Sequence, residues 1–448
     1  MVKDLINKSL LSRFYSYEII KLSIKKDKQL SSVLNNYLNN INLISNTDKR
    51  FITMIVQGTM RLSGRLDWEI KQVYKGNLNK LNLNIKILLR MGVFQLLFMD
   101  KVPNYAAIDT SVNLAKKITP NLSSLTNALL RAISRNKNKI IPSKNSNIEE
   151  LSQYLSHPEW LVKKWIRYFG FKNTENLVSW NNKPPTFWFR VNTSIYSIKS
   201  FKKYLEKNKI KFIQFDELKE FFKISNHQYI LQSEIFLNGW ISVQDPSAGL
   251  VVKLLNPQKG DMITDACSAP GGKTSYISEI LNNCGKILSY DIDKHRLKKL
   301  VENLSRLKIK NVQTELKDVT IDTLIKTDKM LLDIPCTGTG VISKKPDIKW
   351  RKTKNHLIEM NLLQKNILWN AAKFIKPGGI LVYSSCSIEP EENSMIIEDF
   401  LENHPNFNLE PGNLFISKKF IDDRGYLLTM PYHHNIDGSF GARLKLND

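Results

Sequence analysis

The stretch MITDACSAPGGKT at residues 262–274 decides the fold of the C-terminal half of this chain. Residues Met262 to Cys267 predict a buried strand, and the proline and glycines that follow predict a tight turn that opens a helix. Glycines let the backbone approach a ligand, and a helix N-terminus offers free N–H groups and the positive end of its dipole. The turn therefore predicts a site for a nucleotide or an anionic carboxylate. An ATP-binding P-loop is excluded, because that motif needs glycine where this chain has Cys267.

Further short strands alternate with helical segments after this turn, which is typical of a doubly wound, Rossmann-like α/β sheet. A strand over residues 286–290 ends at Asp291, the position at which such folds bind ribose hydroxyls. The next strand, over residues 312–316, is followed by Asp318, which by its position alone is more often a solvated loop carboxylate. The helix between these strands carries an apolar stripe that we expect in the core: Leu297, Leu300, Val301, Leu304 and Leu307.

Two cysteines follow the fourth and fifth predicted strands. Residues 330–332 run into Asp333 and Cys336, and residues 380–383 run into Cys386. Taken singly, each cysteine is more often a small buried apolar residue. At equivalent positions beside an aspartate, at the edge where these sheets carry their chemistry, a thiolate is a natural nucleophile for an electron-poor ring.

The chain has 4 cysteines and 7 histidines, and their spacing fits no metal-binding pattern, so no metal is predicted. No apolar run is long enough to span a bilayer, and the start of the chain lacks the apolar core of a secretion signal. We therefore expect a cytoplasmic protein without a membrane partner.

A length of 448 residues predicts several domains. Residues 1–140 read as helical, with apolar positions at Ile85, Leu88, Leu89, Gly92 and Leu96. A basic, polar linker is expected over residues 135–147. Residues 141–240 predict this linker and a small α/β domain, with strands at 187–192 and 210–215 around a helix at 198–208. Residues 241–448 form the Rossmann-like domain.

Lysine and arginine number 66 against 42 acidic residues, and the excess is uneven: +15 in residues 1–140, +6 in 141–240 and +3 in 241–448. Charge concentrated in one segment favours a nucleic-acid partner, since neutralised phosphates release counterions. Composition drift toward Lys, Asn and Ile is the alternative explanation.

Three ordered motifs resemble the RNA cytosine-5 methyltransferases: DACSAPGGKT at 265–274, DIPC at 333–336, and YSSCS at 383–387 followed by EPEEN. Further matches are SHPEW at 156–160, RVN at 190–192 and KPDIKW at 345–350. The segments DKR at 48–50, RMG at 90–92 and NALLR at 127–131 resemble a NusB-like helical RNA-binding domain. Together they resemble the bacterial 16S ribosomal RNA methyltransferases of the Sun/Fmu/RsmB type. Ser268 stands where the family usually has alanine, and Thr337 stands where it often has serine. Neither difference removes a reacting group.

The resemblance implies S-adenosylmethionine as cofactor. The loop around it would consist of Cys267, Ser268, Ala269, Pro270, Gly271, Gly272 and Lys273. Asp291 would hold the ribose, Asp318 would face the adenine, and Asp333 would lie where cofactor and base meet. Cys386 would add to carbon 6 of cytosine, Cys336 would assist product release, and Asp333 would hydrogen-bond the ring. A target base has to be unstacked for this reaction.

The implied partner is 16S ribosomal RNA, free or in an assembling small subunit, bound by a monomeric enzyme. A basic cluster after the DIPC motif is a candidate for phosphate contact: Lys344, Lys345, Lys349, Arg351, Lys352 and Lys354. Trp350 within it is a candidate for base stacking, although core packing is at least as common for a tryptophan. Two alternatives stay open: a non-catalytic, NusB-like RNA-binding adaptor, and the same chemistry on tRNA.

Overall fold

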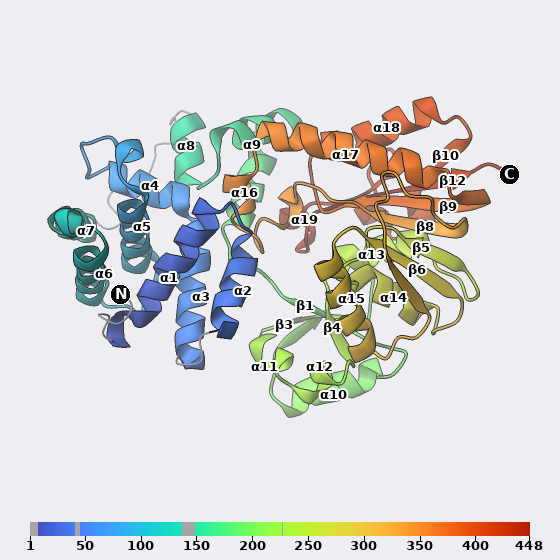
Figure 1. Cartoon of the computed structure of the whole chain (residues 1–448), viewed down its shortest axis with the longest axis horizontal. Helices are drawn as coiled ribbons and strands as arrows, with labels where there is room; N and C mark the ends of the chain where they lie inside the picture. Colours follow the sequence, from blue (N-terminus) through green and yellow to red (C-terminus); the bar gives the residue numbers. More distant parts are fainter. Residues whose placement is uncertain (1–7, 41–44, 137–147, 226) are drawn as a thin grey trace. The chain divides into compact units, whose positions relative to one another are not determined.

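The computed structural model describes residues 8–40, 45–136, 148–225 and 227–448. The chain divides into two compact units (Figure 1). The helical unit consists of Met1–Pro184 and Ile342–Arg351, and the two-sheet unit consists of Pro185–Val341 and Lys352–Asp448. The boundary at residues 140/141 and all of the predicted linker except its first two residues lie in residues 137–147, outside the described part of the chain. The division into three domains therefore stays a prediction.

The helical unit is built from helices, and those within residues 8–135 share one apolar core. Its helices are α1 (Lys8–Lys25), α2 (Leu30–Asn40), α3 (Asn46–Arg61), α4 (Ser63–Lys71), η2 (Leu78–Lys80), α5 (Leu83–Phe98), α6 (Asn104–Ile118), η3 (Pro120–Leu122), α7 (Ser123–Arg135), α8 (Ile148–Tyr154), α9 (Glu159–Asn181) and α16 (Ile348–Arg351). Every predicted apolar position of α5 is buried, which confirms the helical periodicity. Gly92 lets two helices approach, because a Cβ there would lie 2.8 Å from Leu130 Cδ1 of α7.

The two-sheet unit contains a small and a large sheet. Its strands are β1 (Trp188–Val191), β2 (Phe212–Gln214), β3 (Phe221–Ile224), β4 (Ile241–Val243), β5 (Met262–Asp265), β6 (Lys286–Asp291), β7 (Val312–Leu316), β8 (Thr327–Asp333), β9 (Ile375–Ser385), β10 (Phe407–Glu410), β11 (Leu427–Thr429) and β12 (Ser439–Leu446). Its α-helices are α10 (Ile198–Lys207), α11 (His227–Leu231), α12 (Glu234–Leu237), α13 (Pro246–Leu255), α14 (Gly272–Ile280), α15 (Lys294–Arg306), α17 (Lys354–Ala372), α18 (Ser394–Asn403) and α19 (Pro431–His434). Short 3₁₀ helices complete it: η4 (Thr339–Val341), η5 (Pro390–Glu392), η6 (Gly412–Leu414) and η7 (Lys418–Phe420).

The small sheet has the order β2-β3-β1-β4 and is antiparallel throughout. The predicted strands at 187–192 and 210–215 appear as β1 and β2, and the helix between them is α10. Strand β3, which joins β1 to β2, was not predicted, because its run of aromatic residues is too short to be distinguished from a turn.

The large sheet runs β10-β12-β9-β8-β5-β6-β7, with β11 paired to β12. The segment from β9 to β7 is parallel, as predicted for a doubly wound sheet. Strands β10, β11 and β12 add an antiparallel extension. The sheet is therefore mixed, and the sequence pattern did not reveal this because strand direction depends on pairing between distant residues.

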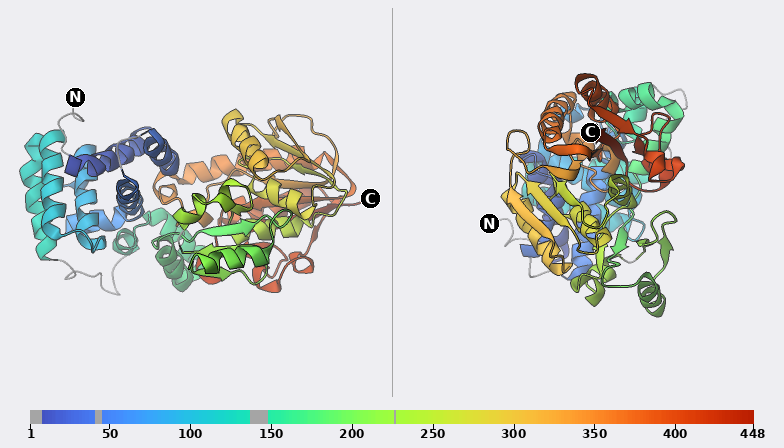
Figure 2. Two further views of the ribbon diagram at one scale, coloured as in Figure 1. Left: turned by 90° about the horizontal axis from the view of Figure 1, so that it is seen from below. Right: turned by 90° about the vertical axis from the view of Figure 1, so that its right-hand side faces the viewer.

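Helices pack on both faces of the large sheet (Figures 1 and 2). Successive residues of β8 alternate between them: Met330 and Leu332 join the core under α17 and α18, and Leu331 joins the core under α13 and α14. The stripe of α15 is buried at Leu300, Leu304 and Leu307, but Val301 is 48% exposed. The expectation of a buried Val301 was wrong, because a step of one residue turns it away from the packed face.

Candidate active site

The carboxyl ends of the parallel strands bring the predicted reactive residues to one edge of the large sheet. Strand β8 pairs in parallel with β9, which places Asp333 opposite Ser384. The Ser384 hydroxyl donates a hydrogen bond of 3.2 Å to Asp333 Oδ1. The prediction that the two cysteine motifs follow neighbouring strands is confirmed.

Lys273 and Asp333 form an ion pair at this edge. The Lys273 ammonium lies 2.7 Å from Asp333 Oδ2, and the two side chains are 16% and 34% exposed. Burial pulls the pKa of Lys273 down, but the charge and hydrogen bond of Asp333 outweigh it, so the pKa lies above its ordinary value. Lys273 therefore stays an ammonium at neutral pH and holds Asp333 in place.

The sulfur atoms of Cys336 and Cys386 lie 3.2 Å apart, so the two thiols share a hydrogen bond. Both residues are partly buried. The hydrogen bond with Cys386, followed by burial, raises the pKa of Cys336 well above its ordinary value. The Cys336 thiol is therefore protonated at neutral pH. The Gly340 N–H donates to the Cys386 carbonyl at 3.0 Å, which ties the two cysteine loops together.

The turn between β5 and α14 keeps residues 267–273 together. Gly271 has φ 97°, a conformation that favours glycine, and a Cβ there would lie 2.9 Å from Leu300 Cδ1. Two side chains of α15 hold the turn from outside: Arg296 donates to the Ala269 carbonyl, and Asn303 donates to the Pro270 carbonyl at 3.0 Å. The turn is therefore a fixed cradle of backbone groups in front of the α14 N-terminus.

Asp291 ends β6 beside this cradle, with 3% of its surface exposed. Its carboxylate accepts hydrogen bonds from the backbone N–H groups of Ala269 at 3.1 Å and Asp293 at 2.9 Å. A carboxylate has about four acceptor positions, so these bonds leave capacity for ribose hydroxyls. Asp318 is close along the sheet edge, because the N–H of its neighbour Lys317 donates to the Asp291 carbonyl at 3.2 Å. Asp318 itself accepts from the Thr320 N–H at 2.9 Å.

Two further residues at this turn, Cys267 and Asp265, have raised pKa values. Burial, together with the neighbouring carboxylates, raises the pKa of Cys267, so this thiol stays protonated and is no nucleophile. Burial raises the pKa of Asp265 to about 7. Its Oδ2 accepts from the Thr274 hydroxyl at 2.7 Å, while its buried Oδ1 has no partner among the described residues. Asp265 was not among the predicted site residues, although an acidic residue at a strand end beside the glycine turn was a usable signal.

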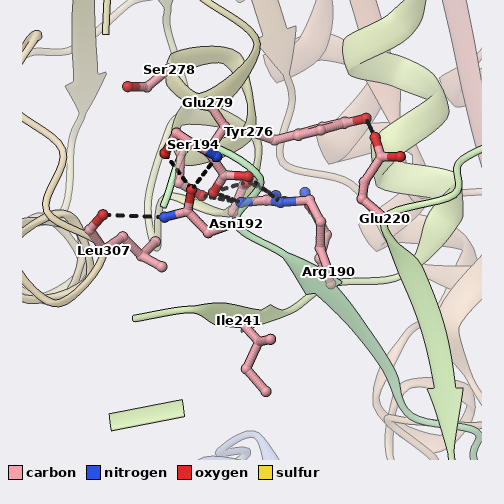
Figure 3. A network of polar contacts seen from close by, with 12 residues as sticks. Arg190, Asn192, Ser194, Glu220, Ile241, Tyr276, Ser278, Glu279 and Leu307 are labelled. Carbon is pink, nitrogen blue, oxygen red and sulfur yellow. Dashed lines mark hydrogen bonds and ion pairs between the residues drawn. The ribbon is translucent and has the colours of Figure 1, made fainter. Parts of the chain in front are cut away.

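Arg190 of the small sheet holds α14 in place, a role that sequence reasoning missed (Figure 3). Its guanidinium is 0% exposed and binds both carboxylate oxygens of Glu279, at 2.6 and 3.0 Å. It also donates to the Gly272 carbonyl at 3.1 Å and to the Ser275 hydroxyl at 3.0 Å. Through Gly272, strand β1 fixes the start of the helix that carries Lys273. The motif RVN at 190–192 was the available signal.

The basic cluster after Cys336 is divided between the two units. Lys349 is 1% exposed and donates to the Asn182 side chain at 3.0 Å. The prediction that Lys349 contacts phosphate was wrong, because the Lys349 side chain is buried within the helical unit. Arg351 is held by Asp27 at 2.7 Å and by Asp347 at 3.3 Å.

Trp350 also has a structural contact: its ring N–H donates to the Met60 carbonyl at 2.8 Å. Lys345 and Lys354 are exposed, and Lys344 and Lys352 are partly exposed. Lys352 and Lys354 belong to the two-sheet unit. The remaining residues of the cluster are therefore candidates for phosphate contact on two separate surfaces, one on each unit.

Within the described ranges, no group of three or more His, Cys, Asp or Glu side chains is arranged to hold a metal ion. None of the helices described there is both long and apolar enough to cross a bilayer. S-Adenosylmethionine fits the residues present, because the buried Asp291 carboxylate beside the turn keeps acceptor capacity for ribose hydroxyls. Its binding residues stay a prediction.

Comparisons with known proteins agree along most of the chain. Residues 252–445 match the family described as 16S rRNA methyltransferase RsmB/F, residues 8–135 match the NusB family, and residues 157–230 match the RsmF/B-like ferredoxin-like domain. A probable ribosomal RNA small subunit methyltransferase B from Synechocystis is 33% identical and covers 90% of this chain and 92% of its own. The ribosomal RNA small subunit methyltransferase B of Proteus mirabilis is 35% identical, over 83% of this chain and 87% of its own.

The crystal structure of PH0851 has a TM-score of 0.79 and 29% identity, and covers 96% of this chain and 97% of its own. The predicted order of a NusB-like helical part, a small α/β part and a Rossmann-like methyltransferase part is confirmed, and the comparisons identify the small part as ferredoxin-like. Methyltransferases of this kind use S-adenosylmethionine, as predicted. The chain belongs to the RsmB/F family of 16S rRNA methyltransferases.

Proposed function

We propose that the protein methylates carbon 5 of a cytosine in 16S ribosomal RNA through a covalent bond between Cys386 and the base. The observation that carries this proposal is the pair of sulfurs 3.2 Å apart, at the sheet edge that also holds the Lys273–Asp333 ion pair. One sulfur alone can add to a ring, whereas a second beside it serves release of the product. A non-catalytic adaptor has no need of this arrangement.

Carbon 5 of cytosine is a poor nucleophile. When the Cys386 thiolate forms a bond to carbon 6, electron density moves to carbon 5, which can then take a methyl group. S-Adenosylmethionine, when bound, supplies that methyl group from a sulfonium. Asp333 hydrogen-bonds the ring during the addition, and Lys273 fixes the Asp333 carboxylate.

Release of the product requires two further changes. The proton on carbon 5 leaves to a base, and the bond between carbon 6 and sulfur breaks to return the Cys386 thiolate. We assign assistance of this step to Cys336, the sulfur adjacent to Cys386. The target nucleotide has to be unstacked, so a loop or an opened nucleotide is the expected substrate.

The names of the relatives support ribosomal RNA of the small subunit as the substrate. The charge of +15 in residues 1–140 supports an RNA-docking role for the helical unit. Two groups of residues, each considered within its own unit, are proposed phosphate contacts: Lys344, Lys345 and Arg351 in the helical unit, and Lys352 and Lys354 in the two-sheet unit. We further propose that the enzyme acts in the cytoplasm as a monomer, on free RNA or on an assembling subunit.

Bisulfite mapping of unmethylated total RNA, incubated with the protein and S-adenosylmethionine, tests the reaction and the substrate together. One protected cytosine in 16S RNA is the expected result. Protection in tRNA would keep the chemistry and overturn the substrate. No protection anywhere, with folded protein and with both free RNA and subunit precursors supplied, would favour the adaptor.

Variants of the cysteines test the covalent mechanism. Cys386→Ala should abolish methylation, and Cys336→Ala should leave the protein bound to RNA as an adduct that survives denaturant. The exposed Cys284 is a matched control, and Cys284→Ala should behave as the unaltered protein. Normal turnover by Cys386→Ala would overturn the assignment.

A further inference from the structure

Glu392 is a buried carboxylate that the mechanism above does not use. It ends η5, and its side chain is 0% exposed. Burial raises the pKa of Glu392, while hydrogen bonds from Ser387, Thr337 and Gln364 oppose this rise. A carboxylate that is removed from water is unfavourable unless its oxygens accept hydrogen bonds. The contacts of Glu392 therefore show what this buried charge holds together.

Its donors come from the residue directly after each of the two cysteines. The hydroxyl of Thr337, which follows Cys336, and the hydroxyl of Ser387, which follows Cys386, donate to the same oxygen, Glu392 Oε2. The distance from Ser387 Oγ is 2.5 Å. The Thr337 backbone N–H donates to Oε1 at 2.8 Å. A single carboxylate thus joins both cysteine loops.

Helix α17 fixes this junction from a third side. The Gln364 amide donates to Glu392 Oε1 at 2.9 Å and to the carbonyl of Pro335, the residue before Cys336, also at 2.9 Å. The Tyr383 hydroxyl donates to the Glu392 carbonyl at 2.6 Å, which anchors η5 to β9. The Glu392 carboxylate therefore contacts both cysteine loops and α17.

The charge of Glu392 also acts on the sulfurs. It contributes to the raised pKa of Cys336, after the Cys386 hydrogen bond, burial and the charge of Cys386. Three other titratable groups face the pair: Lys273, Asp333 and Tyr383. A Cys386 thiolate attracts the Lys273 ammonium, which is also paired with Asp333. The charge of Glu392 favours a proton on Cys336, and the charge of Lys273 favours a thiolate at Cys386.

We propose that Glu392 is a positioning residue that locks the loops of Cys336 and Cys386 together and keeps their shared proton on Cys336. Cys386 is then the sulfur available as a thiolate for addition. This inference rests on the proposed function for its purpose, but the property it predicts belongs to the free enzyme and is measured without RNA or cofactor.

The test compares alkylation of the two cysteines by iodoacetamide over pH 6 to 10, followed by mass spectrometry of the two peptides. In the unaltered protein, Cys386 should react faster than Cys336. In Glu392→Gln, which keeps the size of the side chain and removes its charge, the ratio of the two rates should fall about tenfold, equivalent to about one pKa unit. The alkylation profile of Cys336 should move to lower pH. An unchanged ratio in folded Glu392→Gln would overturn the proposal.

Glu402→Gln is the matched control, because Glu402 is exposed on α18. In this variant the ratio of the two alkylation rates should equal that of the unaltered protein. If Glu392→Gln does not fold, Thr337→Val and Ser387→Ala carry the test, because each removes one hydroxyl donor to Oε2. A fall of the ratio by about threefold or more in both supports the proposal, and any smaller change in either overturns it. Because methylation is not measured, failure of this proposal is distinguishable from failure of the proposed function.

Discussion

The ammonium of Lys273 lies 2.7 Å from the carboxylate of Asp333, although the two residues follow different strands of the large sheet. The pair couples the turn after β5 to the motif after β8. If Asp333 hydrogen-bonds the cytosine ring, Lys273 keeps its carboxylate oriented. Lys273→Met should then slow methyl transfer by about 100-fold, within the usual range for a group that assists proton transfer.

Single-turnover transfer of a labelled methyl group to RNA measures this effect. The control is Lys286→Met, because Lys286 is exposed at the start of β6. A rate within twofold of the unaltered protein for Lys273→Met would contradict the role of the pair.

Asp291→Ala should weaken the binding of S-adenosylmethionine about 10-fold to 100-fold, the usual cost of losing hydrogen bonds to a charged group. The substitution removes the acceptor of the Ala269 and Asp293 N–H groups and the proposed ribose contact. Calorimetric titration with the cofactor measures the loss, and filter binding with RNA should show unchanged affinity. Equal loss of both affinities in a folded variant would count against a role in cofactor binding.

Arg190→Met should destabilise the two-sheet unit by about 3–5 kcal/mol, because it leaves the buried Glu279 carboxylate without its partner. It should also weaken cofactor binding, since Arg190 holds the Gly272 carbonyl at the start of α14. The double variant Arg190→Met with Glu279→Met should recover most of the stability and not the cofactor affinity. Urea unfolding and cofactor titration separate the two effects, and recovery of both by the double variant would show that Arg190 has only a packing role.

Asp265→Asn should change how stability depends on pH. The pKa of Asp265 is raised from 3.8 to about 7, so between these values the folded protein binds more protons than the unfolded chain. The free energy of unfolding of the unaltered protein therefore falls as pH rises from about 4 to 7, by on the order of 4 kcal/mol for this group. The variant lacks this titration and should show a correspondingly flatter profile.

Hydrogen exchange of the β5 amides at pH 5 and pH 8 reports this change within the two-sheet unit. Asp423→Asn, at an exposed position, is the control and should keep the original slope. Identical slopes for Asp265→Asn and the unaltered protein would show that Asp265 is ionised throughout this range.

The sequence by itself determined the parallel strands and the polar residues at their ends. These strands are short apolar runs bounded by turn residues, so their signal is local. It also placed Asp333, Cys336 and Cys386 at one edge, because the ends of neighbouring parallel strands meet there. The motifs further identified the family, which the comparisons confirm.

Tertiary structure alone decided which side chains are buried and which touch. Lys349 was read as a phosphate contact, yet it lies in the core of the helical unit with Asn182. Strands β12 and β10 close the sheet in antiparallel fashion, Arg190 reaches α14, and Glu392 joins two loops that are 50 residues apart. The physical reason is the same in each case: burial and pairing bring together residues distant in the chain, and a local sequence pattern holds no information about those partners.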